Sequence, residues 1–168
     1  MRILWAPWRK PYLERGAEST ACILCQKSRE REDRKNLILC RGQHCFVLLN
    51  LFPYNNGHLM IAPYRHLDRL TSLHRQELLE MAQLAQGSEK ILGTALGAEG
   101  FNLGMNLGRV AGAGIADHIH LHMVPRWVGD TNFLPVLGET KVISEDIDST
   151  YQRLIPHFTE LLTEALRT

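Results

Sequence analysis

Three histidines at alternate positions mark the segment DHIHLHMVPRW, residues 117–127, and they are His118, His120 and His122. Successive side chains of a β-strand point to opposite faces, so on a strand the three rings share one face, about 7 Å apart from one to the next. The residues between them are apolar and would face the core: Ile119, Leu121 and Met123. The alternation therefore predicts a row of titratable rings along one sheet face. The other interpretation is a solvated polar face that happens to contain histidines.

Such a row can carry out nucleophilic chemistry at phosphorus. A neutral histidine with an unprotonated Nε2 is a competent nucleophile, provided that its other nitrogen is held as a hydrogen-bond donor. A backbone carbonyl on the same strand can accept that hydrogen bond. The middle ring of the row has helpers on both sides, which can stabilise developing charge. We therefore expect His120 to be the nucleophile and His122 to contact the phosphate.

Two other functions fit the same residues. The three histidines could bind a catalytic metal ion, because HxH pairs on strands bind zinc, but a further ligand and a water molecule would also be required. Alternatively, the chain could bind nucleotides without turning them over. The residues alone leave these alternatives open, and metal content and product analysis separate them.

A glycine-rich stretch, NLGRVAGAGIAD, lies directly before the histidines. Gly108, Gly112 and Gly114 would allow backbone N–H groups to approach an anion closely, although a plain flexible loop fits the same residues. Three cations could add positive charge but are by default solvated surface residues: Arg109, Arg126 and Lys141.

The segment CILC, residues 22–25, is a CxxC pair. A redox-active pair follows a strand and begins a helix, whereas the preceding RGAEST does not predict a strand. The spacing favours metal binding, because CxxC presents two thiolates to one tetrahedral Zn²⁺. Two pairs of residues could complete the site: Cys40 with Cys45, which would flank a hairpin turn, or His66 with His118.

Composition and charge restrict the class of protein. The chain has 168 residues, of which 45% are hydrophobic and 22% charged, which is typical of one globular domain. The formal net charge of +1 predicts no nucleic-acid polymer as partner, and no apolar run is long enough to span a membrane. Pro7 and Arg9 interrupt the apolar start, so it does not indicate a signal peptide. We expect a cytoplasmic protein with reduced cysteines, in which residues 1–20 pack on their own domain or on a second subunit.

The elements that must position these residues follow one another as strands, helix, strands and helix. This order indicates an α+β fold with an antiparallel sheet and helices against one face. The predicted strands are residues 36–40, 44–50, 58–63 and 101–107, followed by the histidine strand.

Two helices are predicted. The first should begin at an N-cap Ser72 and end at Gly97. Its apolar stripe consists of Leu78, Met81, Ala82, Ala85, Leu92 and Leu96. The second runs from Ser144 to Arg167, and Pro156 should break or kink it. Its apolar stripe consists of Leu154, Phe158, Leu161, Leu162 and Ala165.

The motifs together resemble a known family. HIHLHMV has the pattern His-φ-His-φ-His-φ-φ, with φ apolar, of the histidine triad (HIT) superfamily. Further stretches are similar to the branch that contains the bacterial diadenosine tetraphosphate phosphorylases: LWAPWR, LLNLFPYNNGHLMIAPYRH, FNLGMNLG, AGAGIADHIHLHMVPRW and GDTNFLPVLGETKV. The resemblance covers nearly the whole chain and is specific.

The resemblance implies a fold. It is an α+β half-barrel of antiparallel strands with a long helix, in a single HIT domain over residues 1–168 that usually forms a homodimer. Residues 1–20 would be an N-terminal extension, and residues 144–168 a C-terminal helical segment.

The resemblance also implies roles for individual residues. His120 would form a covalent nucleotidyl-histidine, with His118, His122 and the family's fourth histidine, His58, beside it. Asn50 matches the position that holds the ribose, and Asn106 a position near the sugar and phosphate. The ligands of a structural zinc ion would be Cys22, Cys25, His66 and His118. No catalytic metal or organic cofactor is required.

One position departs from the commonest family pattern. Many members carry Gly-Gln-Ser or Gly-Gln-Thr before the triad, where this chain has Gly114, Ile115 and Ala116. Backbone amides of residues 110–114, including those of Gly112 and Gly114, would then contact the leaving phosphate. This departure fits the phosphorylase branch better than the hydrolases. We expect a dinucleoside polyphosphate substrate, with inorganic phosphate favoured over water as acceptor. Because His122 is not glutamine, hexose-1-phosphate uridylyltransferase activity is not expected.

Overall fold

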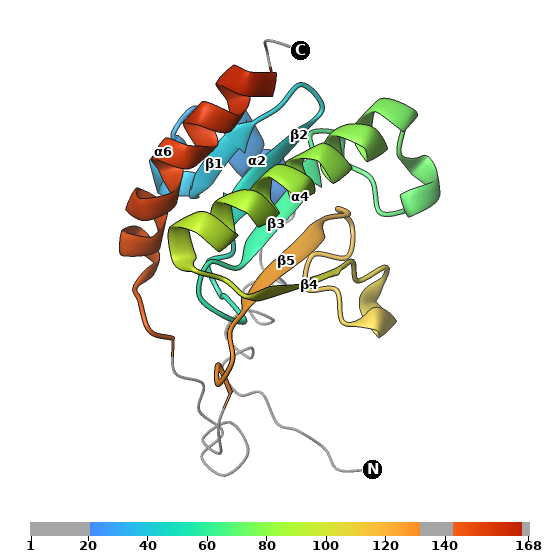
Figure 1. Ribbon diagram of the computed structural model, residues 1–168. Helices are drawn as coiled ribbons and strands as arrows, with labels where there is room; N and C mark the ends of the chain where they lie inside the picture. The colour runs from blue at the N-terminus through green and yellow to red at the C-terminus, as the bar shows by residue number, and fades with distance from the viewer. Residues whose placement is uncertain (1–20, 132–142, 166–168) are drawn as a thin grey trace, which may run out of the picture.

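The computed structural model describes residues 21–131 and 143–165, with side chains described through residue 160 (Figure 1). The elements in chain order are α2 (Ile23–Arg29), α3 (Asp33–Asn36), β1 (Ile38–Arg41), β2 (Cys45–Leu49), β3 (Leu59–Pro63), η2 (Leu70–Ser72), α4 (Arg75–Leu96), β4 (Gly100–Gly104), η3 (Arg109–Ala111), β5 (Leu121–Arg126) and α6 (Ile147–Ala165). The predictions made for residues 1–20 and for Lys141 lie outside the described part. Within it, no helix is long and apolar enough to cross a bilayer.

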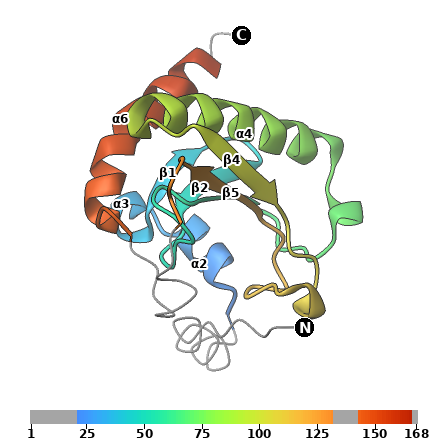
Figure 2. The same ribbon diagram turned by 60° about the horizontal axis from the view of Figure 1, so that its bottom comes forward.

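The five strands form one antiparallel sheet in the order β1-β2-β3-β5-β4. Figure 2 shows α4 and α6 together over one face, with α2 on the opposite side of the sheet. The predicted α+β fold, with an antiparallel sheet covered by helices, is confirmed. The strand predicted over residues 101–107 ends at Gly104, so Asn106 lies in the loop that follows it.

Both faces of the central strands are buried, because helices cover both sides. All residues of β2 and β3 are buried, as is usual for strands that pack on two layers. Val47 and Ile61 belong to the cluster beneath α4 and α6. Phe46 and Met60 belong to a smaller cluster on the other face, which Leu24 of α2 completes. The face that carries α2 also carries the candidate site.

The histidine row is only partly on a strand, and this corrects the prediction. Strand β5 begins at Leu121, so His118 and His120 precede it. The backbone N–H of Ile119 donates to the Leu67 carbonyl at 2.7 Å instead of joining the ladder with β3. The alternation of faces nevertheless holds on the core side: Ile119 and Met123 are buried, and Leu121 is half-buried against the same cluster.

Helix α4 begins later than predicted and buries a shifted stripe. Its N-cap is His74, whose N–H donates to the Glu77 carboxylate at 2.7 Å, while the predicted cap Ser72 lies in η2. The helix ends at Gly97, which has a φ of +64°, as predicted. Two residues of the predicted stripe are exposed: Leu78 and Ala82. The buried residues are Glu77, Met81, Leu84, Ala85, Ser88, Ile91 and Leu92, which form a regular helical face that passes beside Leu78.

Helix α6 runs through Pro156, so of the predicted break or kink, the break is wrong. Pro156 lies on the exposed side, where water can hydrate the carbonyl that the proline ring leaves without its usual partner. Leu154 and Phe158 are fully buried against the sheet and α4, as predicted. The side chains of the remaining predicted stripe lie outside the described residues: Leu161, Leu162 and Ala165.

Candidate active site

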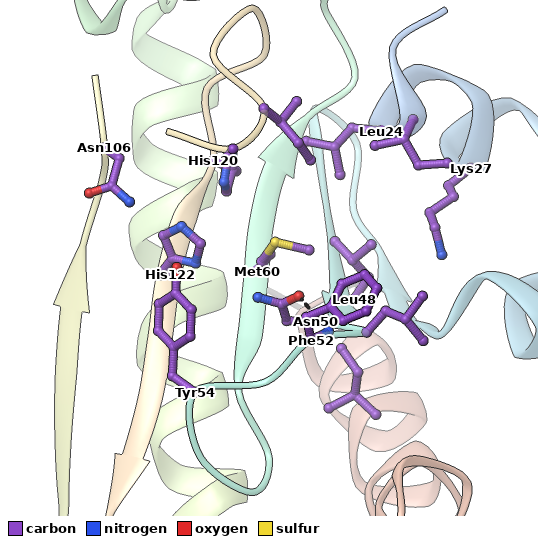
Figure 3. Close-up of a pocket in the computed structure, with 15 residues that line it drawn as sticks. Leu24, Lys27, Leu48, Asn50, Phe52, Tyr54, Met60, Asn106, His120 and His122 are labelled. Carbon is purple, nitrogen blue, oxygen red and sulfur yellow. Dashed lines mark hydrogen bonds between the residues drawn. The ribbon is translucent and has the colours of Figure 1, made fainter. Parts of the chain in front are cut away.

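A cavity of about 150 Å³ opens on the face of the sheet that carries α2 (Figure 3). Its lining combines polar residues with a larger apolar surface, as is usual for small-molecule sites. The polar members are Lys27, Asn50, Tyr54, Asn106, His120 and His122. The remaining members are Ile23, Leu24, Leu48, Leu49, Leu51, Phe52, Met60, Gly114 and Ile115.

His120 presents an unprotonated nitrogen in its neutral state. Its Nδ1 lies 2.8 Å from the backbone oxygen of His118. A carbonyl oxygen only accepts hydrogen bonds, so Nδ1 carries the proton and Nε2 keeps its lone pair. Burial lowers the pKa of His120, which favours this neutral form near pH 7. The backbone carbonyl anticipated from the sequence is present at the neighbouring histidine.

A second chain of hydrogen bonds fixes the tautomer of His122. The backbone N–H of Tyr54 donates to Nδ1 of His58 at 3.0 Å, so the proton of neutral His58 is on Nε2. That Nε2 lies 2.9 Å from Nδ1 of His122 and donates to it. Because Nδ1 of neutral His122 accepts this hydrogen bond, the proton of His122 is on Nε2. The Nε2–H group is then a hydrogen-bond donor beside His120. The ring centroids of His120 and His122 are 4.7 Å apart.

The two asparagines lie at different places along the cavity. Asn106 follows β4 and lies beyond the two histidines, whereas Asn50 follows β2 and lies near the middle (Figure 3). The side-chain oxygen of Asn50 accepts the N–H of Phe52 at 3.0 Å, and its Nδ2 lies 3.3 Å from Nδ1 of His58. Asn50 is thus held in place by the loop that also positions His58.

The structure separates the two glycines predicted to bind phosphate. Gly114 lines the cavity, but Gly112 does not: it ends η3 with a φ of +87°, and its N–H donates to the Arg109 carbonyl at 3.0 Å. Ile115 lines the cavity beside Gly114 and packs against the Leu24 cluster. The cavity therefore has an apolar wall at this position.

The described cations outside α2 do not line the cavity. Arg109 is exposed on η3. Arg126 donates to Asp130 at 2.6 Å and to the side chain of Asn102 at 2.8 Å. Asp130 also accepts a hydrogen bond from Asn55 at 2.8 Å, and this network fixes the loop that leads to His58. The role of Arg126 is therefore structural.

Four residues form a cluster suited to one metal ion. The ligand atoms of Cys22, Cys25, His66 and His118 all lie within 4.8 Å of one another. Nδ1 of His118 is 3.3 Å from Sγ of Cys22 and 3.4 Å from Sγ of Cys25. Its Nε2 donates to the Pro63 carbonyl at 2.9 Å, which leaves Nδ1 free to coordinate. Two thiols and two imidazoles are a tetrahedral zinc ligand set.

Electrostatics in this cluster favour a bound cation. Burial, followed by the neighbouring Cys22, raises the pKa of Cys25. Two thiolates side by side repel each other, and a divalent ion removes that penalty by holding both in the deprotonated form. The alternative ligands suggested by the sequence are ruled out, because Cys40 and Cys45 are buried in the apolar core. Burial raises the pKa of each to about 12.

The geometry also argues against a catalytic metal held by the histidine row. One nitrogen of His118 faces the cysteines and the other donates to Pro63, while Nδ1 of His120 is occupied by a carbonyl. The three rings therefore do not converge on one point. The sequence prediction missed the contribution of α2 and of Tyr54 to the cavity. The available signal for α2 was the pair of apolar residues, Ile23 and Leu24, between the two cysteines.

The chain is similar to known proteins in sequence and in fold. A HIT domain profile matches residues 31–128. The chain is 37% identical over 158 residues to a Mycobacterium tuberculosis (strain ATCC 25618 / H37Rv) protein named AP-4-A phosphorylase, covering 90% of this chain and 81% of that protein. A HIT-like protein of Methanocaldococcus jannaschii is 30% identical over 125 residues, covering 74% and 93%. The solved structure of a Zn-bound histidine triad family protein from Mycobacterium smegmatis has a TM-score of 0.66 at 21% identity, covering 89% of this chain and 99% of that one. The match to the profile and to these relatives shows that the chain belongs to the HIT domain family.

Proposed function

We propose that this protein is a nucleotidyl-transfer enzyme that cleaves dinucleoside polyphosphates, with diadenosine tetraphosphate as substrate and inorganic phosphate as acceptor. The observation that carries the proposal is the fixed tautomer of His120, whose Nε2 lone pair lies in a cavity suited to a nucleotide. The name of the M. tuberculosis relative, AP-4-A phosphorylase, supports the choice of substrate.

The first chemical step is attack of His120 Nε2 on an α-phosphorus of the substrate. An N–P bond forms, the bond from that phosphorus to its bridging oxygen breaks, and ATP leaves with the electron pair. The ring then carries a proton on Nδ1 and a nucleotidyl group on Nε2, so it is cationic. The His118 carbonyl, 2.8 Å from Nδ1, stabilises that charge.

His122 assists the same step. Its Nε2–H is directed by the hydrogen bond from His58 and donates to a non-bridging oxygen on which charge develops. Asn50 holds the ribose and Asn106 the sugar and phosphate, while the apolar walls take up the base. In the second step phosphate attacks the phosphoramidate, the N–P bond breaks, and ADP is released.

We propose that Cys22, Cys25, His66 and His118 hold a structural zinc ion. The Zn-bound M. smegmatis structure supports this choice of metal. When bound, the ion supplies a crosslink between α2, the segment after β3 and the start of the histidine row. It does not take part in phosphoryl chemistry. The homodimer implied by the family resemblance stays a prediction, which sedimentation analysis would test.

Product analysis with diadenosine tetraphosphate tests the reaction. The native protein should form ADP and ATP only when inorganic phosphate is present, and His120→Ala should form neither. His157→Ala is the matched control, since His157 lies on α6 away from the cavity. AMP and ATP without any dependence on phosphate would instead establish an asymmetric hydrolase with the same nucleophile. Full activity in His120→Ala would overturn the assignment of the nucleophile.

A further inference from the structure

Helix α2 connects the metal cluster to the cavity. Cys22 and Cys25, at its N-cap and in its first turn, face the cluster, whereas Ile23, Leu24 and Lys27 line the cavity. With 3.6 residues per turn, these three residues lie on the side of the helix opposite the two cysteines. One short helix, fixed at its start by the metal ligands, therefore supplies one wall of the cavity, and Lys27 is the cation on that wall.

The amine of Lys27 has donors to spare. Its side chain is half-buried, and its Nζ donates to the backbone carbonyl of Asn36 at 3.0 Å. An ammonium group has three N–H bonds, so this contact leaves two of them for a ligand. The nearby carboxylate of Glu30 accepts a hydrogen bond from the side chain of Asn36 at 2.8 Å. This carboxylate thus hydrogen-bonds to Asn36 rather than to Lys27. The Asn36 carbonyl thus fixes the position of the Lys27 amine, which is a hydrogen-bond donor at the edge of an otherwise apolar wall.

The order of residues across the cavity places Lys27 at the base end. Figure 3 shows Asn106 and the histidines on one side, Asn50 and Met60 near the middle, and Lys27 on the far side. If the reacting phosphorus lies at His120 and the ribose at Asn50, as in the proposed function on which this inference rests, the base extends toward α2. It would then lie between apolar side chains with its outer edge near the amine.

We propose that Lys27 is a specificity-determining residue that donates from Nζ to a lone-pair acceptor on the nucleobase, a ring nitrogen or a carbonyl oxygen. Every nucleobase has such an acceptor, whereas the apolar walls offer it no hydrogen bond. The contact therefore separates nucleotides from sugar phosphates, which lack a base. A hydrogen bond to a charged group at a half-exposed site changes affinity on the order of tenfold.

The test compares a nucleotide with its abasic counterpart. Binding of AMP and of ribose 5-phosphate would be measured by NMR titration, which reaches millimolar dissociation constants, for the native protein and for Lys27→Met. Methionine keeps the apolar stem and removes the donor. The dissociation constant of AMP should rise about tenfold and that of ribose 5-phosphate should not change. With diadenosine tetraphosphate, KM should rise by a similar factor while kcat stays the same.

Two further variants protect the interpretation. Lys27→Gln keeps a neutral donor and should bind AMP with intermediate affinity. Lys35→Met removes an exposed lysine that pairs with Glu32, and it should bind both ligands as the native protein does. Unchanged affinity for AMP in Lys27→Met, or an equal loss for both ligands, would overturn the role of Lys27 while leaving the proposed function intact. A native protein that binds neither ligand would overturn both.

Discussion

His58 does not reach the reacting phosphorus in the proposed mechanism, yet its replacement should slow the reaction strongly. His58→Phe keeps a buried ring of similar size but removes both nitrogens. The Tyr54 N–H, 3.0 Å from Nδ1, then loses its acceptor, and the free energy of unfolding should fall by about 1–3 kcal/mol. His122 loses the donor 2.9 Å from its Nδ1, so its proton is no longer fixed on Nε2. Complete removal of a donor to developing charge typically lowers kcat by about 10²–10³-fold, and this is the upper limit of the loss expected for His58→Phe, which keeps His122 in place.

Single-turnover kinetics measure this effect directly. ATP formation from diadenosine tetraphosphate would be followed after acid quenching with enzyme in excess, so that product release does not mask the chemical step. His157→Phe, on α6, is the matched control and should retain the native rate. Thermal unfolding of each variant shows that the folded state persists at the assay temperature.

A double-mutant cycle decides whether His58 acts through His122. The combination of His58→Phe with His122→Ala should be about as slow as His122→Ala alone, because the second substitution removes the group that His58 orients. Multiplicative losses in the double variant would show that the two histidines act independently. Native single-turnover rates in His58→Phe would refute the tautomer argument altogether.

Three further predictions concern stability, the metal and the thiols. The Arg65 guanidinium holds the pKa of Glu77 at about 2, so this pair stabilises the folded state above the unfolded pKa of the carboxyl and loses that contribution as the pH falls toward 2. Glu77→Gln should therefore melt at a lower temperature than the native protein at pH 7, and thermal unfolding scans should show the difference shrinking as the pH falls below about 4. Elemental analysis should find about one zinc ion per chain, and Cys25→Ser should lower both the zinc content and the melting temperature; an unchanged zinc content would contradict the ligand assignment. Burial raises the pKa of Cys40 and Cys45 to about 12, so a thiol reagent at pH 8 should modify neither until the protein is unfolded.

The sequence predicted the backbone carbonyl that fixes the tautomer of His120, for a local reason. The period of two fixes which side chains share a face, and the accepting carbonyl belongs to the residue two positions before His120. The hydrogen bond from His120 to the His118 carbonyl is therefore close to a local property. The choice of metal ligands was not local: only the fold shows that Cys40 and Cys45 point into the core while His66 comes to the CxxC pair.

The errors arose where tertiary packing decides between similar patterns. Leu78 fits a helical stripe as well as Leu84 does, and only the docking of α4 on the sheet selects the stripe that is buried. The effect of Pro156 depends on which side of α6 faces water, which periodicity alone does not give. Lys27 was overlooked because a lysine is by default solvated. The seven residues of α2 carry no sequence pattern that indicates a helix lining a cavity.

The contacts that fix the two active-site tautomers begin and end in main-chain atoms, a carbonyl at residue 118 and an amide at residue 54. Side-chain substitution cannot delete either group, except that proline at position 54 would remove the amide. The path of the chain therefore sets where proton placement begins in this protein, and His58 is the one side chain that relays it to His122. Position 54 should tolerate evolutionary drift in identity without loss of that control. In serine hydrolases a carboxylate orients the catalytic histidine. Here main-chain groups take that role for the histidines.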